Sequence, residues 1–75
     1  MSLRLKQLRK SKGFTQLKIQ ILTGIDQSDY SKLENNKRYL TVEQAKRLAL
    51  VLDTSIDYLL ELTDEPKPYP RSKQY

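Results

Sequence analysis

A strip of hydrogen-bonding side chains carries the chemistry that this sequence offers. Its members are spaced as the outer face of one helix requires, and they comprise Gln27, Ser28, Ser31 and Lys32. An amide, two hydroxyls and an ammonium group can form hydrogen bonds, but none of them is a nucleophile without an activating base. The chain has no His and no Cys, which removes the commonest general base, the thiol nucleophile and the usual zinc ligands. We therefore expect a binding protein and not an enzyme, with no metal and no cofactor.

Two short helices around Gly24 must position this strip. Thr15 suits the N-cap of a helix over 16–23, and Gly24 can adopt the positive φ that ends a helix and turns the chain. Asp26 can cap a second helix over 27–35, because its carboxylate accepts hydrogen bonds from the free backbone amides of the first turn. The apolar residues expected to face inward are Ile19, Leu22, Ile25, Tyr30 and Leu33.

Three further helices surround this pair, and they are predicted over 3–12, 42–52 and 56–61. Thr41 and Gln44 have the spacing of a capping box, and Ser55 suits the cap of the last helix. The apolar residues of these helices recur at helical spacing, and they comprise Leu5, Leu8, Val42, Ala45, Leu48, Ala49, Leu52, Ile56, Leu59 and Leu60. No stretch alternates polar and apolar residues for long enough to form a strand. The sequence predicts an all-α fold of five helices in one domain over 1–62.

Residues 63–75 form a tail of different composition, with three prolines within five residues. Proline excludes a helix interior and favours an extended, polyproline-like segment. The tail is either disordered or laid across the domain. Leu17 and Ile21 favour the second option, because they form an apolar stripe separate from the inward face. We expect Tyr69 or a second subunit to cover this stripe.

The central segment resembles the helix-turn-helix of the phage repressor and Cro type, also called the Xre family. The resemblance extends from about Leu5 to Leu60, and the matching positions are Thr15, Gln16, Ile19, Gly24, Leu33, Glu34, Lys37 and Arg38. It implies a compact, repressor-like domain that binds double-stranded DNA sequence-specifically and regulates transcription. We expect a homodimer on a palindromic operator, with half-sites ~34 Å apart, that represses by occlusion. Activation through contact with a polymerase stays open.

The resemblance also implies roles for single residues in a DNA complex. An α-helix fits the major groove, where base contacts are expected from Gln27, Ser28, Ser31 and Lys32. Gln27 can bind adenine through its amide, whereas Lys32 could contact guanine or a phosphate. Asp29 could cap its own helix or accept from a cytosine amine. Phosphate contacts are implied for Gln16 and for three residues of the following turn, Asn35, Lys37 and Arg38.

In the resembled family, an arginine and a glutamate at the positions of Arg9 and Glu34 form a partly buried ion pair. We expect the same pair here, joining the first helix to the third. Two residues depart from the family pattern. Gln20 occupies a site that is typically small, so it must bend outward or open the helix packing. Tyr30 replaces a smaller Ile or Val, and its hydroxyl needs a partner or water. Both changes could rotate the second helix of the motif.

Positive charge is concentrated in the half of the chain that contains the motif. Residues 1–38 hold nine Lys or Arg and three Asp or Glu, a net charge of +6, whereas residues 39–75 have a net charge of −1. A polyanion that binds the first half would release counterions, which drives much of DNA binding. A basic face that is merely solvated is the alternative. We favour the first interpretation because the charge and the motif coincide.

A different class of function stays open. The last helix and the proline-rich tail could hold a partner protein, as in an antitoxin-like interaction module. The apolar runs are too short to span a membrane, and the first residues lack the apolar block of a signal peptide. We therefore expect a cytoplasmic protein with no membrane contact and no small-molecule ligand.

Overall fold

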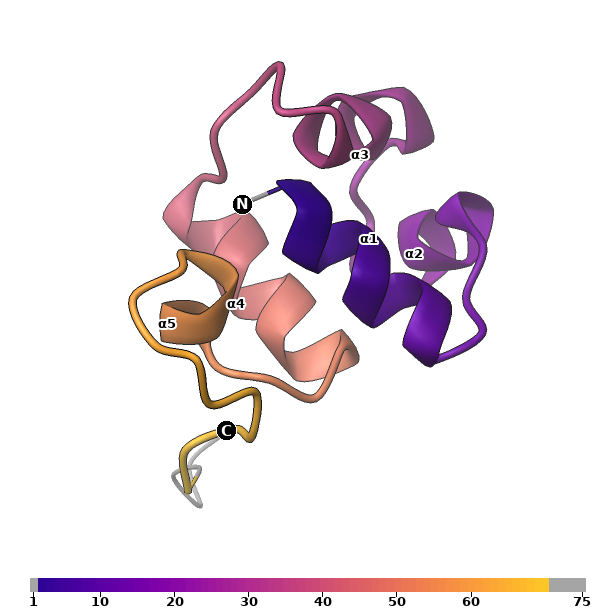
Figure 1. Cartoon of the computed structure of the whole chain (residues 1–75). Coiled ribbons are helices and arrows are strands. Elements are labelled where there is room, and N and C mark those ends of the chain that lie inside the picture. The colour runs from indigo at the N-terminus through magenta and orange to yellow at the C-terminus, as the bar shows by residue number, and fades with distance from the viewer. Residues whose placement is uncertain (1, 71–75) are drawn as a thin grey trace.

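The computed structural model describes residues 2–70, which form five helices and no strand (Figure 1). These helices are α1 Ser2–Ser11, α2 Gln16–Thr23, α3 Gln27–Glu34, α4 Val42–Val51 and α5 Ile56–Leu59. The predicted all-α fold class is confirmed. The helix ends agree with the prediction to within one residue, except that α5 ends two residues earlier. None of the five is long and apolar enough to cross a membrane.

Helix α2 begins and ends at the predicted capping residues. Thr15 Oγ1 accepts a hydrogen bond from a first-turn amide at 3.0 Å. Gly24 has a φ of +77° and donates its N–H to the Gln20 carbonyl at 2.8 Å. Arg47 Nη1 donates to the Thr23 carbonyl at 2.9 Å and would lie 3.4 Å from a Cβ added at Gly24. The turn that leads from α2 to α3 is therefore left-handed and held by α4.

The later helices begin and end with the local chemistry that the sequence predicts. Thr41 Oγ1 accepts from the Gln44 amide at 3.1 Å, and Gln44 Oε1 accepts from the Thr41 amide at 3.0 Å, which completes the capping box. Ser55 Oγ accepts from the first turn of α5 at 3.0 Å. Asn36 and Asp53 have positive φ values, +58° and +53°, where the chain leaves α3 and α4.

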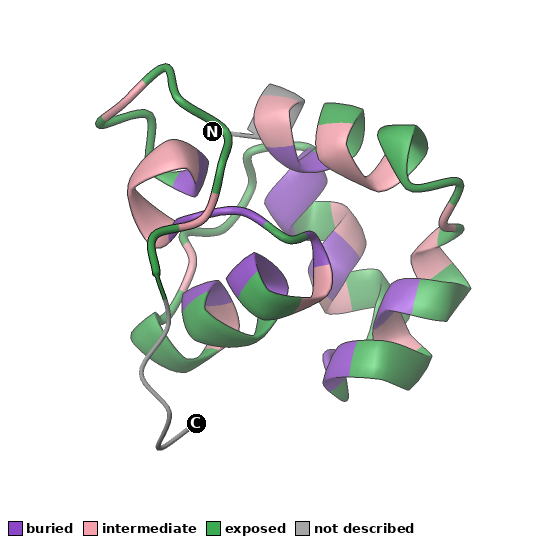
Figure 2. Ribbon diagram, turned by 90° about the horizontal axis from the view of Figure 1, so that it is seen from below, coloured by how far each residue is buried: buried purple, intermediate pink, exposed green. Residues whose placement is uncertain are grey.

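The core lies where the inward faces of the helices meet, as Figure 2 shows by colour. α3 packs against α1 and α2, and α4 packs against α2 and α5. The largest fully buried apolar side chains come from all five helices and from the end of α4, and they are Leu5, Ile19, Tyr30, Leu33, Leu48, Leu52 and Leu59. Packing between helices therefore fixes α3 against the rest of the domain.

Three residues predicted to face inward are exposed. Leu22, Val42 and Leu60 have relative exposures of 43%, 77% and 41%. On α2, Thr23 takes the inward position next to Ile19, because its hydroxyl donates to the Ile19 carbonyl at 2.7 Å and so needs no water. Val42 is the first residue of α4, one turn before the buried face begins, and Leu60 follows the end of α5.

The tail lies along the α5 end of the molecule over residues 63–70 (Figure 1). Arg4 Nη1 donates to the Thr63 carbonyl at 2.7 Å, and Tyr69 Oη donates to Asp57 Oδ2 at 2.8 Å. Leu17 and Ile21 are 52% and 68% exposed. The prediction that Tyr69 covers them is wrong, because its hydroxyl has a partner on α5. The rest of the predicted tail, residues 71–75, lies outside the described residues.

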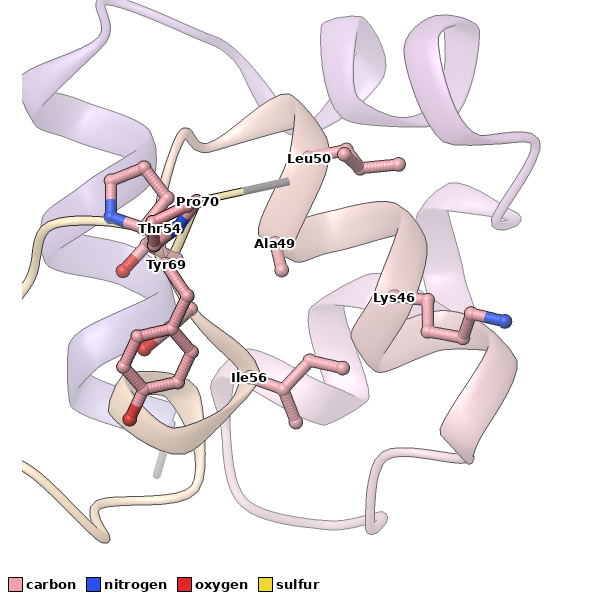
Figure 3. A pocket seen from close by; sticks show the side chains of 9 residues that line it. Lys46, Ala49, Leu50, Thr54, Ile56, Tyr69 and Pro70 are labelled. Carbon is pink, nitrogen blue, oxygen red and sulfur yellow. The ribbon is translucent and has the colours of Figure 1, made fainter. Parts of the chain in front are cut away.

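The tail, α4 and the start of α5 line a small, partly open pocket, which Figure 3 shows from close by. Its volume is about 140 Å³, and its lining includes Ala49, Leu50, Thr54, Ile56, Pro68, Tyr69 and Pro70. Most small-molecule sites have volumes of ~300–1,000 Å³. This pocket is therefore smaller than most small-molecule sites.

Candidate functional site

Asp26, the residue before α3, caps the first turn of this helix. Asp26 Oδ2 accepts from the Ser28 amide at 3.1 Å and from the Ser28 hydroxyl at 2.5 Å. These two hydrogen bonds hold the pKa of the Asp26 carboxyl below its ordinary value. Because the Ser28 hydroxyl already donates to Asp26, its oxygen can offer another molecule only an acceptor. Ser28 is thus part of the cap as well as part of the predicted strip.

A second cap comes from α2, which sequence reasoning missed. Gln20 Oε1 accepts a hydrogen bond from the Gln27 amide at 2.8 Å. The expectation that Gln20 bends outward or opens the packing is therefore replaced by a specific contact with the start of α3. The available signal was an amide side chain seven residues before the first residue of a short helix. That spacing alone does not say which of the nearby backbone amides it would reach.

The predicted strip lies beside α2 and borders a shallow, polar concavity. Gln27, Ser28 and Lys32 are exposed, and Ser31 is half-buried. The concavity is lined by side chains from α2, from the turn and from α3, namely Gln16, Gln20, Asp26, Gln27, Ser28 and Ser31. Asn35 Nδ2 donates to the Ser31 carbonyl at 2.9 Å, so this amide closes its own helix. Side chains that are apart in sequence therefore share one face.

Two exposed cations follow α3. Lys37 and Arg38 lie in the turn after the helix, and both are exposed. Arg38 Nη1 lies 3.5 Å from Asp29 Oδ1, and these two side chains are 55% and 41% exposed. Of the two roles expected for Asp29, capping its own helix is not the contact that it makes here, and accepting from a cytosine stays a prediction. Arg38 instead neutralises the acid on the outer side of α3.

A polar network joins α1, α2 and α3 behind the strip. Arg9 Nε donates to Glu34 Oε2 at 2.6 Å, Arg9 Nη2 donates to Glu34 Oε1 at 3.2 Å, and the two side chains are 11% and 3% exposed. Gln16 Nε2 also donates to Glu34 Oε1, at 3.0 Å. Burial acts to raise the pKa of Glu34, but the polar groups of Arg9, Tyr30 and Gln16 outweigh it and hold this pKa below its ordinary value. The side-chain amide of Gln16 therefore already donates one hydrogen bond within the protein.

The Tyr30 hydroxyl lies close enough to this network to affect the pKa of Glu34, but it does not meet the distance and angle of an ordinary hydrogen bond. Its oxygen is buried and has no hydrogen-bond partner among the described residues. Burial first, and then the Glu34 carboxylate, raises the pKa of Tyr30 above its ordinary value, so the hydroxyl is neutral. A buried hydroxyl without a partner destabilises a fold.

Replacing Tyr30 by phenylalanine should therefore raise the free energy of unfolding by about 1 kcal/mol. The ring stays in the core, and only the unpartnered oxygen is removed. Urea unfolding of Tyr30→Phe against the parent measures the change. Tyr39→Phe is the matched control, because Tyr39 is 88% exposed and should not alter stability. A lower stability for Tyr30→Phe alone would show that the hydroxyl donates a hydrogen bond to Glu34 in solution.

The chain resembles known proteins over most of its length. A family model described as a helix-turn-helix domain matches residues 3–65. A Bacillus subtilis (strain 168) protein, described as the uncharacterized HTH-type transcriptional regulator YobD, is 37% identical over 65 residues. This match covers 87% of the chain but 58% of that relative, so the chain spans less than two thirds of it. The solved structure of a SinR protein/SinI protein complex contains a chain that matches with a TM-score of 0.75 and 29% identity, over 85% of this chain and 67% of that one.

Proposed function

The chain belongs to the helix-turn-helix domain family, and from this premise we propose that it binds double-stranded DNA and regulates transcription. The observation that supports this most directly is the polar, outward face of α3, which borders the concavity next to α2. A helix of this size fits the major groove, and side chains near its N-terminus then reach base edges.

Within this proposal, the exposed side chains divide into two groups. Gln27 contacts bases, because an amide can donate to and accept from adenine in one bidentate pair. Lys32 extends from the same helix, while Ser28 and Ser31 offer short polar groups. Gln16, Asn35, Lys37 and Arg38 contact phosphates and set the register of the helix on the duplex. Gln16 and Asn35 each hold an intramolecular hydrogen bond, so the exposed cations carry most of this attraction.

We further propose a homodimer that represses transcription in the cytoplasm by occupying a palindromic operator. One helix contacts only a few base pairs, so specific binding requires two copies on half-sites about one helical turn, ~34 Å, apart. A dimer of this kind blocks a polymerase by occupancy alone.

Selection of bound sequences from a random duplex pool tests this proposal. An enriched palindrome is expected, with affinity that falls steeply as salt rises. Gln27→Ala should relax the preference at one base pair of each half-site by about 5–150-fold, the discrimination of a good bidentate contact. Binding without any enriched sequence would contradict a sequence-specific regulator.

A protein partner is the second candidate, because the matched solved structure is a complex of two different proteins. The partner would contact the exposed apolar side chains near α5 and the tail, which comprise Leu50, Leu60, Leu62 and Tyr69. Hydrogen exchange measured in cell extract and in buffer tests this, since a partner would protect residues 60–70 only in extract. Equal exchange in both would remove the candidate.

A further inference from the structure

Two glutamines of α2 contact the two opposite ends of α3. Gln16 and Gln20 are four residues apart, so they lie on the same face of the helix. Gln16 Nε2 donates to Glu34 Oε1 at 3.0 Å, and Glu34 is the last residue of α3. Gln20 Oε1 accepts from the amide of Gln27 at 2.8 Å, and Gln27 is the first residue of α3. The position of α3 along its own axis is therefore fixed from α2 at both ends.

The contact at Gln20 reaches the residue that carries the base contact in the function proposed above. The first amides of a helix have no partner inside the helix. Asp26 satisfies the amide of Ser28, and Gln20 satisfies that of Gln27. Because the Gln27 side chain branches from the Cα bonded to this nitrogen, the Gln20 hydrogen bond restrains the point from which the side chain extends.

We propose that Gln20 is a positioning residue for base recognition: it holds the first residue of α3 so that the Gln27 amide meets one base pair. This inference rests on the proposed function. It assigns specificity to a residue of the neighbouring helix that need not touch a base. A residue that only stabilises the domain would change binding to every DNA sequence by the same factor. A positioning residue changes the preference at one base pair.

Two variants separate the hydrogen bond from other effects of the side chain. Gln20→Met keeps an unbranched side chain of similar length but has no strong acceptor for the Gln27 amide. Gln20→Glu keeps the acceptor and adds a negative charge, which weakens binding to all DNA. The charge affects preferred and unrelated sequences alike, so the ratio of their affinities isolates the positioning effect.

The experiment measures affinities for the duplex enriched by the parent, for the same duplex changed at the base pair that Gln27→Ala relaxes, and for an unrelated duplex. Gln20→Met should lower discrimination at that base pair by about tenfold, within the range of one bidentate contact. Gln20→Glu should keep the parent's discrimination although its absolute affinities fall. Gln20→Met/Gln27→Ala should discriminate no worse at this base pair than Gln27→Ala alone, because the two residues act through one contact. Thermal melting of each variant verifies that it is folded at the assay temperature.

The outcomes distinguish this inference from the function on which it rests. If Gln20→Met keeps the parent's preference, or if Gln20→Glu loses as much discrimination as Gln20→Met, the positioning role is overturned and sequence-specific binding stands. If the parent enriches no sequence, the proposed function fails and this inference fails with it. If Gln20→Met loses discrimination at this base pair and Gln20→Glu keeps it, the positioning role is supported.

Discussion

Arg9→Ala should lower the free energy of unfolding by about 3–5 kcal/mol, which corresponds to a fall in melting temperature of more than ~12 °C for a domain of this size. The variant leaves the Glu34 carboxylate, whose side chain is 3% exposed, without its cation. When a buried charge loses its partner, the free-energy cost of its desolvation is no longer compensated. Gln16 still donates one hydrogen bond to Glu34, but an amide brings no compensating charge.

A double variant separates the stranded charge from lost packing. Arg9→Ala/Glu34→Gln should be more stable than Arg9→Ala, because the glutamine keeps the shape of the glutamate and removes the charge. Arg38→Ala is the matched control for loss of an exposed arginine, and it should change stability by less than ~1 kcal/mol. If the double variant were no more stable than Arg9→Ala, the loss would come from the arginine's contacts and not from the charge of Glu34.

The pH dependence of this difference has a definite sign. In the parent, the pKa of Glu34 lies below its ordinary value of 4.5, so its contribution is present above that pH and is lost as pH falls through the folded-state pKa. In Arg9→Ala, burial raises the pKa of Glu34 without Arg9 to oppose it, so this variant loses stability as pH rises through the raised pKa. The difference in melting temperature between the parent and Arg9→Ala should therefore increase from about pH 4 to pH 7.

Local chemistry made the helix ends predictable from the sequence. Thr15, Asp26 and Ser55 each satisfy backbone amides within three residues, so the cap and its partner lie in one short segment. Gly24 is similar, because glycine adopts a positive φ without the steric cost that a Cβ imposes. Apolar spacing was a weaker guide at the edges of the core. It could not separate Leu22 from Thr23, since both lie within about 60° of Ile19 around a helix.

Partners distant in sequence could not be chosen from the residues alone. Gln20 had several backbone amides within reach, and the packing of α2 against α3 decided that it contacts Gln27. The tail shows the same limit, because Tyr69 could cover an apolar stripe or donate to an acid, and the position of α5 brings Asp57 to its hydroxyl. The strip itself was predictable, since its members share one helix. The bonds that Ser28 makes within its own cap were not.

Arg38→Ala should weaken DNA binding more than Lys37→Ala, although each variant removes one exposed cation. Within the proposed function, each loss removes one charged contact with phosphate, worth about tenfold in affinity, and lowers the salt slope by ~0.9. Arg38 has a second role, because its Nη1 lies 3.5 Å from Asp29 Oδ1. Without Arg38, the charge of Asp29 faces the phosphates unopposed. Titration of the enriched duplex at several salt concentrations should give Arg38→Ala an affinity several-fold lower than that of Lys37→Ala.

Asp29→Asn decides whether this second role is real. In the Arg38→Ala background, it should restore affinity to the level of Lys37→Ala, because only the phosphate contact is then missing. In the Lys37→Ala background, it should change affinity little, since Arg38 already neutralises Asp29 there. Equal effects of Asp29→Asn in the two backgrounds would show that the acid acts on DNA independently of Arg38. Unequal effects would explain how an acid is tolerated on the face of α3 that contacts DNA in the proposed complex: the cation that binds the phosphate also screens the carboxylate beside it.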